Sequence, residues 1–130
     1  MNAESIELLA SRADVWSFLS EPYHLTDWWP GITGVEPDRR GFARGARWKV
    51  IATRRNVFAG PRSKETLLLI REVDPYERWA WHLLATKLDV EIRLRASGED
   101  RTLVTIALSK GSPAVALRRL YDLCQTAARI

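Results

Sequence analysis

The stretch KLDVEIRLRA, at residues 87–96, alternates apolar and polar residues more regularly than any other part of the chain. In an extended strand, its apolar residues from Leu88 to Leu94 lie on one face and its charged residues lie on the other. A strand with one apolar and one charged face is typical of an antiparallel sheet that is covered on one side only. The rest of the chain must therefore supply further strands and an element that covers the apolar face.

Five other segments have the composition or the alternation of strands, and we expect them to join the same sheet. They are residues 6–10, 47–52, 64–73, 78–84 and 103–108. The sequence SGED at 97–100 predicts a hairpin turn, and residues 56–62, which include Gly60 and Pro61, predict another turn. The sequence therefore predicts an antiparallel sheet of about six or seven strands.

Two short helices are predicted between the first strand and the rest of the sheet. Ser11 and Asp14 have the spacing of a capping box at the start of the first helix. Pro22 interrupts this helix and starts a second one over residues 23–28, which Pro30-Gly31 ends. Neither helix is long enough to cover the sheet.

A longer helix is predicted at the end of the chain. Ser112 is its expected N-cap, Pro113 takes the first helical position, and an amphipathic pattern follows for about 17 residues. The chain is therefore interpreted as one α+β domain over residues 1–130, with a curved antiparallel sheet and a long C-terminal helix. Because sheet twist makes the covered face concave, we expect an apolar cavity between the sheet and this helix.

Six tryptophans in 130 residues are an unusual feature of the composition. Trp79 and Trp81 share the inward face of their strand, and His82, which follows Trp81 on the opposite face, is expected to face solvent. Trp28 and Trp29 are adjacent in a short helix, so we expect only one of them, Trp29, to lie at the mouth of the cavity. The inward tryptophans either pack the core or line the cavity, and the sequence leaves both interpretations open.

The net charge of +4 is concentrated in one segment. Residues 38–64 hold nine basic residues and one acid, a local charge of +8, whereas residues 1–37 carry −5 and residues 65–130 carry +1. Three interpretations of this basic block stay open: a solvated rim, a site for an anionic small ligand or a membrane surface, or a nucleic-acid site. The solvated rim requires the fewest assumptions, and we do not favour nucleic acid as a partner.

Several classes of site are excluded by the residues present. Cys124 is the single cysteine, so an internal disulfide and a cysteine metal cluster are excluded. We find no metal-ligand spacing, nucleophile elbow, phosphate loop or dinucleotide fingerprint. The N-terminal residues do not resemble a signal peptide, and no apolar run is long enough to span a membrane. We therefore expect a cytoplasmic protein with no metal, no cofactor and no integral membrane association, and we assign no catalytic residue.

The sequence ASRADVWSFLSEPYHLTDWWPG at residues 10–31 resembles the opening of the START-like (SRPBCC) superfamily. More narrowly it resembles the polyketide cyclase/dehydrase and lipid-transport group, which shares the architecture of the birch-pollen allergens. VDPYERW at 73–79 and the terminal helix continue the likeness along the whole chain. The resemblance implies a helix-grip fold, in which the sheet wraps around the C-terminal helix, and a cavity for a hydrophobic or amphipathic small molecule. The superfamily holds cyclases, lipid carriers, ligand sensors and chaperone-ATPase activators, so membership alone does not choose a function.

Our leading hypothesis is that the protein binds a lipid-, quinone- or polyketide-like molecule in this cavity. The candidate lining residues are the apolar and aromatic positions expected to face inward. They are Phe18, Trp29, Trp48, Val50, Trp79, Trp81, Leu83, Val90, Ile92, Ile106, Leu117 and Tyr121. Tyr121 or an arginine from residues 39–55 would orient the ligand.

Two alternatives remain open. The first is an enzyme that resembles polyketide cyclases and aromatases, and it requires polar groups such as His24, Asp27 and Tyr121 to point into the cavity. The second is a partner-binding module that resembles the chaperone-ATPase activators, and it requires a closed cavity and an exposed apolar patch. Cys124 is interpreted as an inert core thiol in all three hypotheses.

Overall fold

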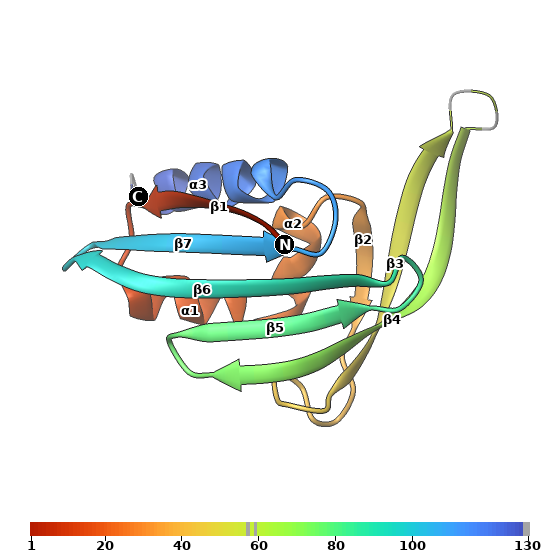
Figure 1. The fold of residues 1–130 in the computed structure, drawn as a ribbon, viewed down its shortest axis with the longest axis horizontal. Helices are drawn as coiled ribbons and strands as arrows, with labels where there is room; N and C mark the ends of the chain where they lie inside the picture. The colour runs from red at the N-terminus through yellow and green to blue at the C-terminus, as the bar shows by residue number, and fades with distance from the viewer. Residues whose placement is uncertain (57, 59, 129–130) are drawn as a thin grey trace.

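The computed structural model describes residues 1–56, 58 and 60–128, and the side chains of residues 54–56, 61 and 125–128 lie outside this description. A first strand and short helices are followed by six strands and a final helix (Figure 1). The elements are β1 (Asn2–Leu8), α1 (Arg12–Leu19), the 3-10 helix η1 (Pro22–His24), α2 (Leu25–Trp28), β2 (Ile32–Glu36), β3 (Arg47–Asn56), β4 (Gly60–Asp74), β5 (Arg78–Leu83), β6 (Leu88–Gly98), β7 (Arg101–Leu108) and α3 (Ala114–Ala128).

The seven strands form one antiparallel sheet in the order β1-β7-β6-β5-β4-β3-β2. The sheet is curved, and α3 packs against β1 and α2 (Figure 1). This arrangement confirms the predicted α+β helix-grip fold. It also places the short helices and the C-terminal helix around the apolar face of one sheet.

The alternation of residues 87–96, which predicted the fold, matches the burial of the side chains on β6. On β6, Val90, Ile92 and Leu94 are buried, whereas Arg93 and Arg95 between and after them are exposed. The sheet therefore has one dry face and one wet face, because a period of two in the sequence places alternate side chains on opposite sides.

The helix starts are also confirmed. The Ser11 hydroxyl accepts a hydrogen bond from the Asp14 backbone N–H at 3.1 Å, and it caps α1. The Ser112 hydroxyl accepts one from the Ala114 backbone N–H at 3.2 Å at the start of α3. The helix α3 spans 15 residues within the described part of the chain, which ends at residue 128. The predicted second helix is divided into η1 and α2, which together span seven residues.

Two strand predictions need correction. The strand β2 was not predicted, because its five residues include Thr33 and Gly34 and show no clear alternation. The strand β4 begins at Gly60 rather than at residue 64, so the predicted turn over 56–62 is mostly strand, with residues 57 and 59 outside the described part. Pro61 fits in β4 because no strand pairs with the outer edge there.

The paired ends of β3 and β4 extend beyond the rest of the sheet. The pairing of β2 with β3 ends at Ala52, and the pairing of β5 with β4 begins at Leu68. In the described part of the chain, residues 54–56 of β3 and 60–62 of β4 therefore pair with each other and with no further strand, with Arg54 opposite Arg62. Figure 1 shows this two-stranded ribbon, which we call the β3–β4 arm, projecting from one end of the molecule.

Candidate ligand pocket

A cluster of aromatic side chains fills the concave face where β3, β4 and β5 meet α2. The Trp79 and Trp81 ring centroids lie 4.4 Å apart, and the Trp29 ring lies 5.0 Å from Trp81. Trp28 contacts Trp79 and Trp81, and Trp48 lies 5.8 Å from Trp79. All five indoles are buried. At this end of the sheet the tryptophans form the hydrophobic core.

Trp28 and Trp29 both face inward, which contradicts the prediction that only one would. Trp28 closes the last turn of α2, but Trp29 has already left the helix, with φ −89° and ψ 122°. The change from helical to extended backbone turns consecutive side chains to the same side, so their rings meet edge to face at 5.5 Å. Trp29 is therefore buried rather than placed at an entrance.

The buried indole N–H groups of Trp48 and Trp79 differ in whether they have a hydrogen-bond partner. Trp48 Nε1 donates to the Gly41 carbonyl oxygen at 2.7 Å. Trp79 Nε1 is buried and has no hydrogen-bond partner in the described part of the chain. A buried donor without an acceptor costs free energy, so these two otherwise similar tryptophans differ in what they contribute to stability.

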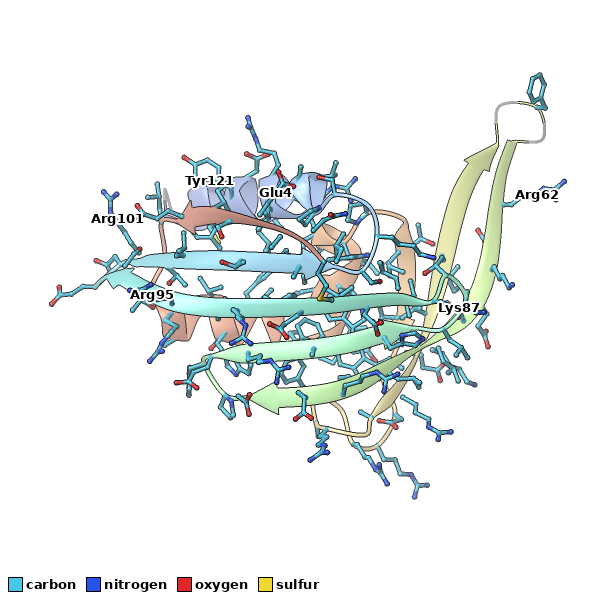
Figure 2. The ribbon with its side chains drawn as sticks, viewed as in Figure 1. Glu4, Arg62, Lys87, Arg95, Arg101 and Tyr121 are labelled. Atoms are coloured by element: carbon cyan, nitrogen blue, oxygen red, sulfur yellow. The ribbon has the colours of Figure 1, made fainter. Side chains whose placement is uncertain are left out.

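A pocket of about 530 Å³ lies at the end of the molecule away from the β3–β4 arm. Its described lining comes from the β1–α1 connection, α1, the β6–β7 turn and the C-terminal half of α3. The lining residues are Leu9, Ala10, Ser11, Asp14, Val15, Phe18, Asp100, Leu123 and Cys124. In Figure 2, Arg95 and Arg101 mark the end of the β6–β7 hairpin beside it. We call it the α1–α3 pocket.

Local sequence features fix the walls of this pocket. The Ser11 cap turns the chain from the β1 edge into α1, and Val15 on the first turn of the helix is buried. The Thr102 hydroxyl on β7 donates to the Ala10 carbonyl oxygen at 2.8 Å, and Thr102 is 0% exposed. This hydrogen bond ties the β1–α1 connection to the sheet. Phe18 at the other end of α1 stacks on His24, with ring centroids 4.3 Å apart.

The pocket combines apolar walls with a polar rim. Leu123 and Cys124 are partly buried on the α3 side, and burial raises the pKa of the Cys124 thiol. Asp14 and Asp100 are exposed. The thiol is therefore a neutral part of the wall at neutral pH. The rim includes the two carboxylates, and Arg95 and Arg101 lie on the hairpin beside them.

Of the twelve predicted lining residues, Phe18 lines the α1–α3 pocket. Tyr121 is partly buried on α3. The other ten are buried in the core: Trp29, Trp48, Val50, Trp79, Trp81, Leu83, Val90, Ile92, Ile106 and Leu117. Apart from Phe18, the residues that line the α1–α3 pocket were not among those predicted from the sequence. The available signal was the run of small residues where β1 gives way to α1, Ala10 and Ser11, since small side chains leave space beside a helix.

The residues considered for catalysis lie outside the α1–α3 pocket. The His24 ring lies with Nδ1 2.8 Å from the Phe18 carbonyl oxygen, and Asp27 is exposed. His82 was expected to face solvent, but its side chain is only 16% exposed and its Nδ1 lies 2.8 Å from Asp89 Oδ1 on β6. The pairing of β5 with β6 places this carboxylate opposite the imidazole, so both stay on the outer face and cover each other.

The described residues contain no group of three or more His, Cys, Asp or Glu side chains positioned to hold a metal ion. No helix in the described part of the chain has the length and apolar character needed to cross a membrane.

The family of the chain follows from comparison of its sequence with known proteins. The family model for polyketide cyclase / dehydrase and lipid transport matches residues 3–123. The chain belongs to this family, which confirms the START-like resemblance of residues 10–31. Among curated proteins, none matches this sequence.

Solved structures share the fold at low identity. Protein NE0264 from Nitrosomonas europaea is 17% identical, with 98% of this chain and 96% of that chain covered and a TM-score of 0.72. A point mutant of norcoclaurine synthase from Thalictrum flavum, in complex with a transition-state analogue, is 17% identical, with coverages of 97% and 94% and a TM-score of 0.69. The Aha1 dimer from Colwellia psychrerythraea is 18% identical, with coverages of 95% and 94% and a TM-score of 0.64. These likenesses extend to the fold alone.

Proposed function

We propose that this protein binds an apolar or amphipathic small molecule, of a lipid-, quinone- or polyketide-like kind, in the α1–α3 pocket. The observation that carries the proposal is the pocket itself, with a volume of about 530 Å³ and walls formed by Leu9, Val15, Phe18 and Leu123. Small-molecule sites are of this size and are lined mainly by apolar side chains with a few polar groups. The family, described by polyketide cyclisation and lipid transport, supports a ligand of this class.

The rim favours one orientation of the ligand. Asp14 and Asp100 accept hydrogen bonds, so a hydroxyl or amino group of the ligand lies toward them while its apolar body lies against Phe18. A ligand of about twenty heavy atoms at about −0.3 kcal/mol per atom binds with a Kd of about 40 µM. This affinity suits a carrier or sensor that releases its ligand readily.

Cys124 provides a direct test, because it is the single cysteine of the chain and lines the pocket. The rate at which a thiol reagent labels Cys124 is measured at mildly alkaline pH with fatty acids, quinones and aromatic polyketides. A bound ligand is expected to slow the labelling about tenfold at saturation, because it covers the thiol. Labelling of the unfolded chain must stay unchanged, which shows that the compound does not consume the reagent.

A pair of matched variants locates the site. Ala10→Phe places a large ring in the pocket and is expected to weaken binding at least tenfold. Ala114→Phe makes the same change at an exposed position at the start of α3 and is expected to leave binding unchanged. If no compound protects Cys124, or if both variants bind equally well, the α1–α3 pocket is not the ligand site.

A further inference from the structure

The tip of the β3–β4 arm exposes a large aromatic side chain. Phe58 lies between β3 and β4 and is 98% exposed. A phenylalanine is among the residues most often buried in folded proteins, and a single strongly exposed one at the end of a projecting ribbon has no role in the core. Phe58 therefore exposes an apolar ring in the connection between the paired ends of β3 and β4.

The arm below this tip carries only positive charge. Residues 53–64 contain Arg54, Arg55, Arg62 and Lys64 and no acidic residue. The side chains of Arg62 and Lys64 are exposed, and Figure 2 shows Arg62 reaching out from the arm. This segment accounts for four of the nine basic residues in the basic block of residues 38–64.

We propose that the β3–β4 arm docks on an anionic lipid bilayer, with Phe58 inserted at the boundary between headgroups and acyl chains. Strand rise is about 3.3 Å per residue, so the backbone of Arg62 lies about 7 Å below Gly60 at the end of β4. An aromatic side chain that enters the interface by about 5–10 Å therefore brings Arg62 to the level of the lipid phosphates. Lys64, two residues further, remains within about two Debye lengths of the surface.

The apolar tip is the feature that favours a bilayer over nucleic acid. A nucleic-acid site places aromatic rings where bases stack on them, within a basic groove that follows the backbone. Here the exposed Phe58 ring lies in the connection at the end of the arm, and the exposed cations Arg62 and Lys64 follow it on β4. This is the order in which a bilayer presents its acyl chains and phosphates. The α1–α3 pocket lies at the opposite end of the molecule, so this docking is independent of the proposed ligand.

The expected binding is weak and reversible. Each cation near an anionic leaflet contributes about fivefold to the partition coefficient, and burial of part of a phenylalanine ring contributes about tenfold. The test is sedimentation with vesicles of phosphatidylcholine, either pure or with about a third phosphatidylserine. The protein is expected to bind the anionic vesicles in low salt and to be released by high salt.

Three variants separate the contributions. Phe58→Ala is expected to lower the partition about tenfold, and Arg62→Glu about twentyfold, because it removes one cation and adds one anion. Arg95→Glu makes the same change of net charge at the exposed end of β6, on the opposite side of the molecule from Arg62 (Figure 2), and is expected to change the partition less than twofold. All three side chains are exposed, so the variants keep the fold, which circular dichroism checks.

Phe58→Trp gives a direct readout of insertion. Its fluorescence, after subtraction of the signal of the unchanged protein, is expected to shift to shorter wavelength on anionic vesicles and to be quenched by brominated acyl chains. The proposal is overturned if Phe58→Ala binds as well as the unchanged protein, if Arg95→Glu weakens binding as much as Arg62→Glu, or if the tryptophan at 58 stays in water. Binding of a DNA duplex that depends on Arg62 but not on Phe58, without vesicle binding, would assign the arm to nucleic acid instead.

Discussion

Trp48 and Trp79 allow one substitution to be compared at two buried sites that differ mainly in a hydrogen bond. Their side chains are 0% and 1% exposed, and their rings are 5.8 Å apart in the same cluster. Trp48 Nε1 donates to the Gly41 carbonyl oxygen, whereas Trp79 Nε1 has no partner in the described part of the chain. Replacement of each by phenylalanine removes the indole N–H and leaves a small cavity.

The cavity and lost burial cost about the same in both variants. Phenylalanine is smaller than tryptophan by about 40 Å³, which corresponds to about 1 kcal/mol of cavity cost and about 1 kcal/mol of lost transfer free energy. Trp48→Phe also breaks a hydrogen bond and leaves the Gly41 carbonyl without it, which adds about 1 kcal/mol. Trp79→Phe removes a buried unsatisfied donor, which returns about 1–2 kcal/mol. The expected losses of unfolding free energy are about 3 kcal/mol for Trp48→Phe and less than about 1 kcal/mol for Trp79→Phe.

The assay is urea and thermal unfolding followed by far-ultraviolet circular dichroism, because both substitutions change the tryptophan fluorescence. A difference of about 2 kcal/mol between the variants corresponds to melting temperatures about 8 °C apart for a domain of this size. If Trp79→Phe destabilises the protein as much as Trp48→Phe, the Trp79 N–H has an acceptor in solution and the reasoning from the unsatisfied donor fails.

Two further predictions concern the pocket wall and the outer face. Thr102→Val should lower the unfolding free energy by about 1–2 kcal/mol and weaken ligand protection of the pocket thiol, because it removes the hydrogen bond that ties the Ala10 carbonyl to β7; unchanged stability and protection would contradict this. On the outer face, burial would raise the pKa of Glu91, but hydrogen bonds from the Arg93 and Arg78 guanidiniums outweigh it and hold the pKa below its usual range. A carboxylate whose pKa is lower in the folded state stabilises the fold above its unfolded pKa and loses that effect as the pH falls through its folded pKa. Glu91→Gln should therefore cost about 1 kcal/mol at neutral pH and progressively less below about pH 4, measured by urea unfolding across pH. An equal cost at neutral and acid pH would exclude the ion-pair explanation.

The strands that were predicted correctly are those in which apolar residues recur at every second position and those same residues are buried. Residues 90–94 and 104–108 each place every second residue in the core, so the pattern is visible in the sequence. The arm residues from Gly60 to Ser63 have no covered face and hence no reason to alternate. Their strand conformation depends on backbone pairing with β3, which composition does not encode. Because this segment shows no alternation, its turn-forming residues Gly60 and Pro61 predicted a turn instead of a strand.

The position of the pocket was not predictable because it depends on volume rather than on polarity. The sequence shows correctly that Trp48, Trp79 and Trp81 face the covered side of the sheet. Whether they line a cavity or fill it depends on whether neighbouring rings reach them. Trp29 reaches Trp81 because the backbone is already extended at residue 29, directly after α2 ends. Space is left where the side chains are small, near Ala10 at the end of β1.

The two proposed sites lie at opposite ends of the molecule. An anionic surface would attract the exposed cations of the arm, Arg62 and Lys64. Docking through the arm would therefore orient the protein with the α1–α3 pocket away from the bilayer. A ligand would then enter and leave through water rather than directly from the membrane. Vesicle binding that is unchanged by Ala10→Phe, together with ligand protection that is unchanged by Phe58→Ala, would support this separation, whereas mutual dependence would show that the two ends are coupled.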